Sequence, residues 1–257
     1  NGGGALMESV KMTGLFIEKG PIVQVKEYIT APILQVRLSA IKILSDNDAH
    51  ILYSGPMVVL VNRLSASASE ILASALQDYK RAVIVGDSKT HGKGTVQTVL
   101  RLNHNAKFGS VKITTANYYR ISGGSTQLKG VIPDIIIHSP YDYMDIGEES
   151  LPNAIKWSEV NMALYSPVTN LSSIISFLNE KSKIRREADP HFDAYKKYLM
   201  RVKTINEKKE LSLNIDTRRN TAKTEKELSD FQNKLMPDGE KKDKKSDIVL
   251  SETLQIL

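Results

Sequence analysis

The segment from residue 57 to residue 86 constrains the fold of this chain more than any other. Residues 57–61 form a continuous apolar run, Met-Val-Val-Leu-Val, of the kind found in strands that are buried on both faces. Residues 67–79 carry apolar side chains at helical spacing, and residues 82–85 form a second apolar run. A strand, a helix and a strand within about 30 residues make a βαβ unit, whose strands are parallel. The sequence therefore predicts an α/β core with an at least partly parallel sheet.

The rest of the chain divides into two parts. Residues 5–16 have the spacing of a helix, whereas residues 21–26, 94–102 and 110–119 have the patterns of strands. Residues 28–50 fit neither period and are interpreted as strand and loop. The composition changes near residue 150, after which strand signals are few and Lys and Glu are frequent. We predict a core of residues 1–149 and a mainly helical extension of residues 150–257, with a charged, mobile stretch at residues 238–246.

Composition excludes several kinds of chemistry. The 257 residues contain no cysteine, which rules out disulfides, thiolate metal sites and a cysteine nucleophile. The five histidines are scattered and do not indicate a metal site, and no run of about 18 apolar residues is present. The chain begins at Asn1 inside a glycine run, without Met, so we expect it to be part of a longer protein.

A cluster of serines stands where the first buried strand turns into the helix. At such a junction the helix N-terminus directs free N–H groups and a positive dipole towards whatever binds there, which suits an oxyanion. Ser65, Ser67 and Ser69 all lie in this cluster, and each could instead serve only as a helix cap. From the residues alone, the capping role is the simpler explanation.

A glycine-framed lysine follows the second buried strand. The stretch from Gly86 to Thr95 superficially resembles a phosphate-binding loop, but five residues separate Gly86 from Gly92 and Gly94 stands where that loop needs Ser or Thr. Lys93 is instead placed to fit tightly against neighbouring backbone. A lysine in a dry pocket can lose its proton near neutral pH and act as a base towards a serine hydroxyl.

Four motifs together resemble the carboxy-terminal processing peptidases, also called tail-specific proteases, in their long Gram-negative form. They occur in the family's order over residues 1–140, and the region of Leu151, Pro152 and Trp157 resembles the start of that form's helical extension. The motifs are Asn1-Gly2-Gly3-Gly4-Ala5-Leu6, Ser65-Ala66-Ser67-Ala68-Ser69-Glu70-Ile71, Gly92-Lys93-Gly94-Thr95-Val96-Gln97, and Gly123-Gly124-Ser125-Thr126-Gln127 with Lys129-Gly130-Val131-Ile132-Pro133-Asp134.

The resemblance assigns roles to individual residues. It implies that Ser67 is the nucleophile, that Lys93 is its general base, and that Gln97 orients the lysine. The N–H groups of Ala68 and Gly4 would form the oxyanion hole, and Ala68 directly follows the nucleophile at a helix start, as an oxyanion donor should. Ser65 and Ser69 remain rival nucleophiles.

The same resemblance implies a fold, a function and a location. The fold would be a partial α/β core of the type shared by crotonases and Clp proteases, followed by the helical extension. The function would be serine endoproteolysis of proteins with accessible C-terminal tails, without a cofactor, in the periplasm of a Gram-negative bacterium. An adaptor protein and association with the periphery of the inner membrane are further partner expectations, whereas nucleic acid is not expected.

Two alternatives stay open at this point. The chain could be a catalytically silent scaffold or peptide-binding protein on the same fold, although a scaffold has no chemical need for Ser67, Lys93 and Gln97 together. The basic extension could bind nucleic acid, for which Tyr195 and Tyr198 beside two lysines give little support.

Overall fold

The computed structural model of the chain describes residues 2–31, 36–102, 108–208, 210, 212–235 and 247–257. Its strands are β1 (Gly20–Ala31), β2 (Val36–Asp46), β3 (Val58–Val61), β4 (Val83–Gly86), β5 (Thr95–Arg101), β6 (Ser110–Tyr119) and β7 (Ile135–Ile136). Its α-helices are α1 (Leu6–Gly14), α2 (Ala68–Asp78), α3 (Ser172–Ala188), α4 (Pro190–Asn206), α5 (Ile215–Leu235) and α6 (Ile248–Ile256), with 3-10 turns η1 (Pro140–Tyr143) and η2 (Glu148–Ser150).

The predicted βαβ unit is confirmed as β3, α2 and β4. Strands β3 and β4 pair in parallel, with Val58 opposite Val83, and β7 adds a further parallel strand in the order β3-β4-β7. The carboxyl ends of β3 and β4 therefore meet at one edge of this sheet, which is where ligand sites form in parallel sheets. The loops that follow these two strands carry the serine cluster and the lysine.

Strand β4 has its side chains buried on both faces of the sheet. Ile84 packs into an apolar cluster that includes Ile71 and Leu76 of α2. Its neighbours Val83 and Val85 point the other way and join a second cluster. This alternation follows from the two-residue period of a strand and explains why residues 82–85 are apolar throughout.

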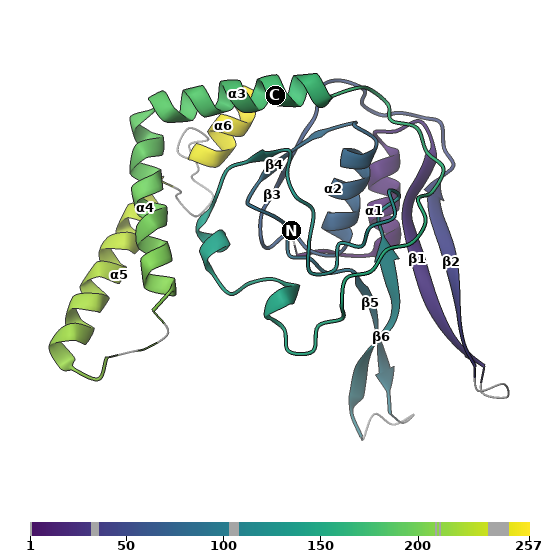
Figure 1. Cartoon of the computed structure of the whole chain (residues 1–257), viewed down its shortest axis with the longest axis horizontal. Helices are drawn as coiled ribbons and strands as arrows, with labels where there is room; N and C mark the ends of the chain where they lie inside the picture. The colour runs from purple at the N-terminus through teal and green to yellow at the C-terminus, as the bar shows by residue number, and fades with distance from the viewer. Residues whose placement is uncertain (1, 32–35, 103–107, 209, 211, 236–246) are drawn as a thin grey trace.

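The second cluster is completed by the helical extension. Phe192, Tyr195, Tyr198 and Leu199 of α4 are buried there together with residues of α5 and α6. Each such side chain stabilises the fold by roughly 1.5–3 kcal/mol when fully buried. In Figure 1, α3 runs across the top of the molecule with α6 beneath it, and α4 and α5 descend at the side. The extension thus covers one face of the parallel sheet, and its predicted helical character is confirmed.

The antiparallel sheet has the order β2-β1-β6-β5. Strands β1 and β2 pair along most of their length, whereas β1 and β6 pair only from Gln24 to Glu27. The outer parts of this sheet therefore separate into two hairpins, which leave the body of the protein on the same side (Figure 1). The predicted strands at residues 94–102 and 110–119 are confirmed, and most of residues 28–50, left undecided by the sequence pattern, belongs to the β1–β2 hairpin.

Two sequence-based predictions are not tested by the described residues. The mobile stretch predicted at residues 238–246 lies outside the described residues, and the domain boundary at residue 150 stays a prediction. Among the helices described, none is long and apolar enough to cross a membrane.

Candidate active site

Ser67 occupies a strained turn between β3 and α2. Its backbone has φ 55° and ψ −116°, an unusual conformation for a residue with a side chain. Such a conformation costs on the order of 1–3 kcal/mol and persists only where surrounding contacts hold it. Ser67 is the N-cap of α2, so the N–H of Ala68, the first residue of the helix, lies directly after it.

The neighbouring serines have structural partners. The Ser65 hydroxyl is buried and accepts a hydrogen bond from the Asn62 N–H at 3.1 Å, which closes the turn after β3. Ser69 lies within the first turn of α2, where its N–H donates to the Ala66 carbonyl at 3.1 Å. These contacts fit the capping and packing roles expected for Ser65 and Ser69, although they do not test which serine is the nucleophile.

The backbone around Lys93 is fixed by β6 and by the segment that follows it. The Lys93 carbonyl accepts hydrogen bonds from the Thr126 hydroxyl, at 2.9 Å, and from the Tyr118 hydroxyl. The Gly94 N–H donates to the Gln127 side-chain oxygen at 2.8 Å. A Cβ on Gly94 would lie 2.7 Å from the backbone nitrogen of Gln127. Glycine is therefore required at this position for the two segments to approach.

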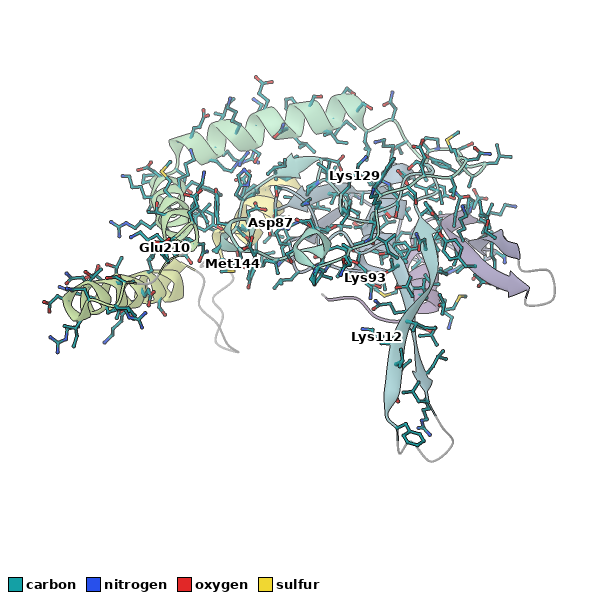
Figure 2. The ribbon with its side chains drawn as sticks, turned by 60° about the horizontal axis from the view of Figure 1, so that its bottom comes forward. Asp87, Lys93, Lys112, Lys129, Met144 and Glu210 are labelled. Atoms are coloured by element: carbon teal, nitrogen blue, oxygen red, sulfur yellow. The ribbon has the colours of Figure 1, made fainter. Side chains whose placement is uncertain are left out.

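The Lys93 side chain contacts Gln97. Lys93 Nζ donates to Gln97 Oε1 at 3.4 Å, as the resemblance implied for these two residues, and the lysine is half-buried. Figure 2 shows Lys93 at the base of the β5–β6 hairpin, with Lys112 farther out along it. Among the described contacts, no hydrogen bond joins Ser67 Oγ to Lys93 Nζ, although the structure brings the two loops together.

Glu70 connects the two loops and was not recognised from the sequence as a site residue. One carboxylate oxygen accepts hydrogen bonds from the Thr90 hydroxyl at 2.5 Å and the Gly92 N–H at 2.7 Å. The other oxygen accepts from the Ser67 N–H at 2.8 Å and the Lys93 N–H at 3.0 Å. Glu70 thus ties the backbone of the serine to the backbone of the lysine.

Burial dominates the electrostatics of Glu70. The side chain is fully buried, and this raises the pKa of its carboxyl from 4.5 to about 7, although the four hydrogen bonds act in the opposite direction. The sequence did hold a signal, because Ser67 followed three residues later by Glu70 has the spacing of a capping box. That pattern predicts the Ser67 contact but not the three contacts to the lysine loop.

The glycine run lies beside the serine junction. A Cβ on Gly3, which has φ +106°, would lie 2.9 Å from both the Ala66 carbonyl oxygen and Ser67 Cβ. A Cβ on Gly4 would meet nothing within 4 Å. The structure therefore places Gly3 directly against Ser67, and the assignment of Gly4 as an oxyanion donor stays a prediction.

Asp87, directly after β4, is a second buried carboxyl that the sequence did not single out. It accepts a hydrogen bond from the Arg63 N–H at 2.9 Å, and burial raises its pKa to about 6. Within the described part of the chain, no group of three or more His, Asp or Glu side chains is arranged to hold a metal ion.

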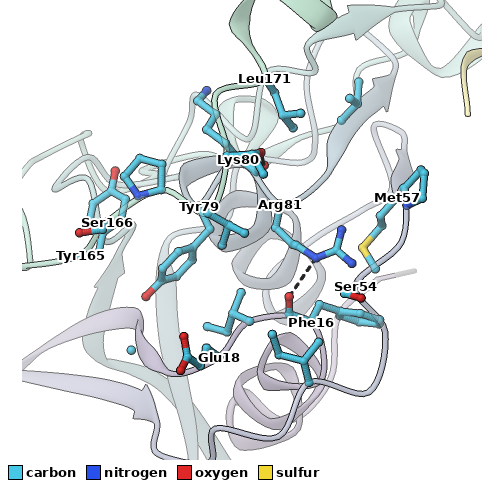
Figure 3. A pocket seen from close by; sticks show the side chains of 18 of the residues that line it. Phe16, Glu18, Ser54, Met57, Tyr79, Lys80, Arg81, Tyr165, Ser166 and Leu171 are labelled. Atoms are coloured by element: carbon cyan, nitrogen blue, oxygen red, sulfur yellow. Dashed lines mark hydrogen bonds between the residues drawn. The ribbon is translucent and has the colours of Figure 1, made fainter.

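A cavity of about 1090 Å³ lies away from these residues. It is lined by residues that follow the carboxyl end of α2, including Tyr79 and Arg81, and by Met57 and Leu171 (Figure 3). Ser67 stands at the opposite end of the same helix, about 16 Å away at 1.5 Å per residue. Size alone would favour this cavity as a site, but the polar groups suited to acyl transfer gather at the other end of α2.

Comparisons with known proteins place the chain in a family. Residues 1–137 match the model of peptidase family S41, and residues 141–257 match the C-terminal domain of tail specific protease. A tail-specific protease of Haemophilus influenzae is 39% identical over 251 residues, covering 94% of this chain and 35% of that protein. A carboxy-terminal-processing protease of Bartonella bacilliformis is 38% identical over 163 residues, covering 61% of this chain and 35% of that protein.

Among solved structures, a photosystem II D1 C-terminal processing protease is 37% identical, with a TM-score of 0.43, over 54% of this chain and 32% of that chain. The chain spans little more than a third of the length of the two curated relatives. The family model covers more than half of the chain, including the glycine run, the serine junction and the lysine loop. On this basis the chain belongs to peptidase family S41.

Proposed function

We propose that this chain carries the catalytic centre of a serine endopeptidase that cleaves proteins recognised through their C-terminal tails. Membership of the S41 family supports a serine-type peptidase, and the names of the relatives support action on C-termini. The assignment of Ser67 as nucleophile and Lys93 as base rests on the site itself. The observation that carries it is the Glu70 carboxylate, one oxygen of which accepts hydrogen bonds from the N–H groups of both Ser67 and Lys93.

The proposed reaction begins with the Ser67 hydroxyl. Ser67 Oγ attacks the scissile carbonyl carbon and gives its proton to the unprotonated amine of Lys93, which first turns from Gln97 towards the serine. Lys93 then passes this proton to the leaving amine as the peptide bond breaks and the acyl-enzyme remains. Water then attacks the acyl carbon and gives a proton to Lys93, which returns it to Ser67 Oγ as the acyl–oxygen bond breaks and the carboxylic acid product leaves. Atoms and charge therefore balance over the cycle.

The oxyanion needs donors on the opposite side of the carbonyl from Lys93. The N–H of Ala68 is suitably placed because it follows the nucleophile at the start of α2, where the helix dipole adds positive potential. The N–H of Gly4 is the proposed second donor, on the evidence of the glycine run beside Ser67. Gln97 would hold the Lys93 amine between turnovers and limit the positions available to it.

Location and partners form part of the same proposal. The resemblance to the long Gram-negative members supports a periplasmic location near the inner membrane, protein substrates with accessible C-termini, and an adaptor protein. A catalytically silent scaffold is the alternative from another class. Because a scaffold would cleave nothing, activity measurements separate the two.

The decisive experiment is cleavage of a tail-bearing protein by the full-length protein and its Ser67→Ala variant. We expect cleavage by the first and none above background by the second, with both folded by circular dichroism. Cleavage by neither would support the scaffold, and equal cleavage by both would place the nucleophile elsewhere.

A further inference from the structure

Residues 142–149 lie along the loop that carries Lys93. Because the C-terminal domain model matches the chain from residue 141, before the boundary predicted at residue 150, we count this segment as the start of the extension. The Asp142 carboxylate accepts hydrogen bonds from the Ser88 N–H at 3.1 Å and the Ser88 hydroxyl at 2.6 Å. The Glu148 N–H donates to the His91 carbonyl at 2.9 Å. The extension therefore touches the lysine loop at both ends, close to Lys93 itself. Figure 2 shows Asp87 of this loop and Met144 of the extension on the same side of the molecule.

Arg63 joins this segment to the loop of the nucleophile. It stands four residues before Ser67, and its side chain is 5% exposed. The guanidinium donates to the Glu149 carboxylate at 2.6 Å, to the Thr90 carbonyl at 2.9 Å and to the Ile146 carbonyl. A planar guanidinium with a fixed fork of donors can hold three segments at set distances, which a lysine ammonium cannot do. One side chain thus spans the serine loop, the lysine loop and the extension.

The contacts of Arg63 lead to the proposed catalytic pair through two further residues, Thr90 and Glu70. Thr90, whose carbonyl Arg63 holds, donates its hydroxyl to Glu70 at 2.5 Å. Glu70 in turn accepts from the N–H groups of Ser67 and Lys93. A shift of Arg63 would therefore move Thr90 and, with it, the carboxylate that fixes both backbones.

Glu149 is the counter-ion that makes the burial of Arg63 tolerable. Burial alone would raise the pKa of the Glu149 carboxyl, but hydrogen bonds from Lys89 and Arg63 hold this pKa below its usual value. Glu149 is therefore ionised at neutral pH. A buried guanidinium without a partner would be strongly destabilising. Gly147 permits the approach: it has φ +128°, and a Cβ there would lie 2.6 Å from the guanidinium and 2.5 Å from Glu149 Oε2.

We propose that Arg63 and Glu149 are positioning residues, and that through them the start of the extension sets the placement of Lys93 relative to Ser67. This inference rests on the proposed function, because it concerns the geometry of that catalytic pair. It assigns the extension a role in catalysis beyond covering the parallel sheet. Neither residue touches the reacting atoms; both act through Thr90 and Glu70.

The test uses Glu149→Ala and Arg63→Lys in the full-length protein. Misplacement of a catalytic group by about 1 Å can cost on the order of 100-fold in rate. We therefore expect kcat per folded molecule to fall about 10- to 100-fold in each variant, with KM changed by less than about threefold, because substrate binding is not addressed. The double variant should lose little more than Arg63→Lys alone, since the two residues act as one unit.

Arg120→Lys is the matched control. Arg120 forms a comparable ion pair with Asp78, at 2.5 Å, but at the carboxyl end of α2 away from Ser67. We expect it to lower Tm as Arg63→Lys does while leaving kcat per folded molecule close to that of the wild type. A purely structural role for Arg63 would give these two variants the same kinetics.

Distinct outcomes separate this inference from the proposed function. Normal kcat in Glu149→Ala, or an equal loss in Arg120→Lys, would overturn the inference while Ser67→Ala remained inactive. Full activity of Ser67→Ala would overturn the proposed function instead. If Glu149→Ala or Arg63→Lys fails to fold, Glu149→Gln decides the matter, because its amide oxygen can still accept a hydrogen bond from the Arg63 guanidinium while the negative charge is lost. Wild-type kcat per folded molecule in Glu149→Gln would then overturn the inference.

Discussion

Replacing Glu70 with Gln probes the connection between the two catalytic loops. The Glu70 carboxylate accepts four hydrogen bonds, two on each oxygen. A glutamine of the same shape has one acceptor oxygen and one NH2 group, so two of the four donors lose their acceptor. Each buried donor left unsatisfied costs about 1–3 kcal/mol. Two such donors give an expected loss of about 2–6 kcal/mol in the free energy of unfolding at pH 7.

Activity should fall as well, because the new NH2 group faces either the N–H groups of Ser67 and Lys93, which share one oxygen, or the Thr90 and Gly92 donors of the lysine loop. Either orientation disturbs a contact that positions the catalytic pair. The assay combines urea unfolding with kcat and KM on a tail-bearing substrate. Glu252→Gln is the matched control, since Glu252 is a buried glutamate paired with Arg185 in the extension at 2.7 Å. The reasoning would be refuted if Glu70→Gln kept wild-type stability and kcat, or if Glu252→Gln lost as much kcat.

Four further predictions concern the same site. Ser67→Ala and Lys93→Ala should each reduce kcat by about 10³-fold or more without unfolding the protein. Ser65→Ala and Ser69→Ala should retain most of the wild-type kcat. Burial raises the pKa of Glu70 from 4.5 to about 7, so the protonated carboxyl adds about 3 kcal/mol to the free energy of unfolding below pH 4.5. This contribution is lost as the pH rises through about 7. The free energy of unfolding, measured with urea, should therefore fall with pH across this range in the wild type, and Glu70→Gln should lack this dependence. Cleavage should survive EDTA, and loss restored by zinc would contradict the mechanism. The 257-residue chain, whose match covers 35% of each curated relative, should cleave more slowly than the full-length protein, by about 100-fold if a glycine-run donor needs contacts outside this chain to hold it. Equal specific activity would contradict that role.

The layout of the core follows from local pattern. The apolar run ending at Val61, the helical spacing after Ser67 and the run ending at Gly86 each carry a short-range signal, and parallel pairing follows from the length of the connection. The position of Lys93 beside the serine loop follows in turn, because both loops leave the carboxyl ends of adjacent strands. This much of the candidate site is readable from spacing alone.

The contacts that fix the site are not readable in this way. Glu70 accepts donors from residues more than 20 positions away, and Arg63 reaches Glu149 across 86 positions. No local propensity marks such partners, since they depend on which segments the completed fold brings together. The packing of Tyr195 against the parallel sheet is equally non-local, because a helix periodicity shows that a face is buried but not against what.

The central claim is that Ser67 is the nucleophile activated by Lys93. The most direct test is to treat the full-length protein with a fluorophosphonate, which phosphonylates activated serines, and to identify the modified residue by peptide mass spectrometry. The account predicts modification of Ser67, at a rate greatly reduced in Lys93→Ala and with no label in Ser67→Ala. Label on Ser65 or Ser69, or an unchanged rate in Lys93→Ala, would contradict it.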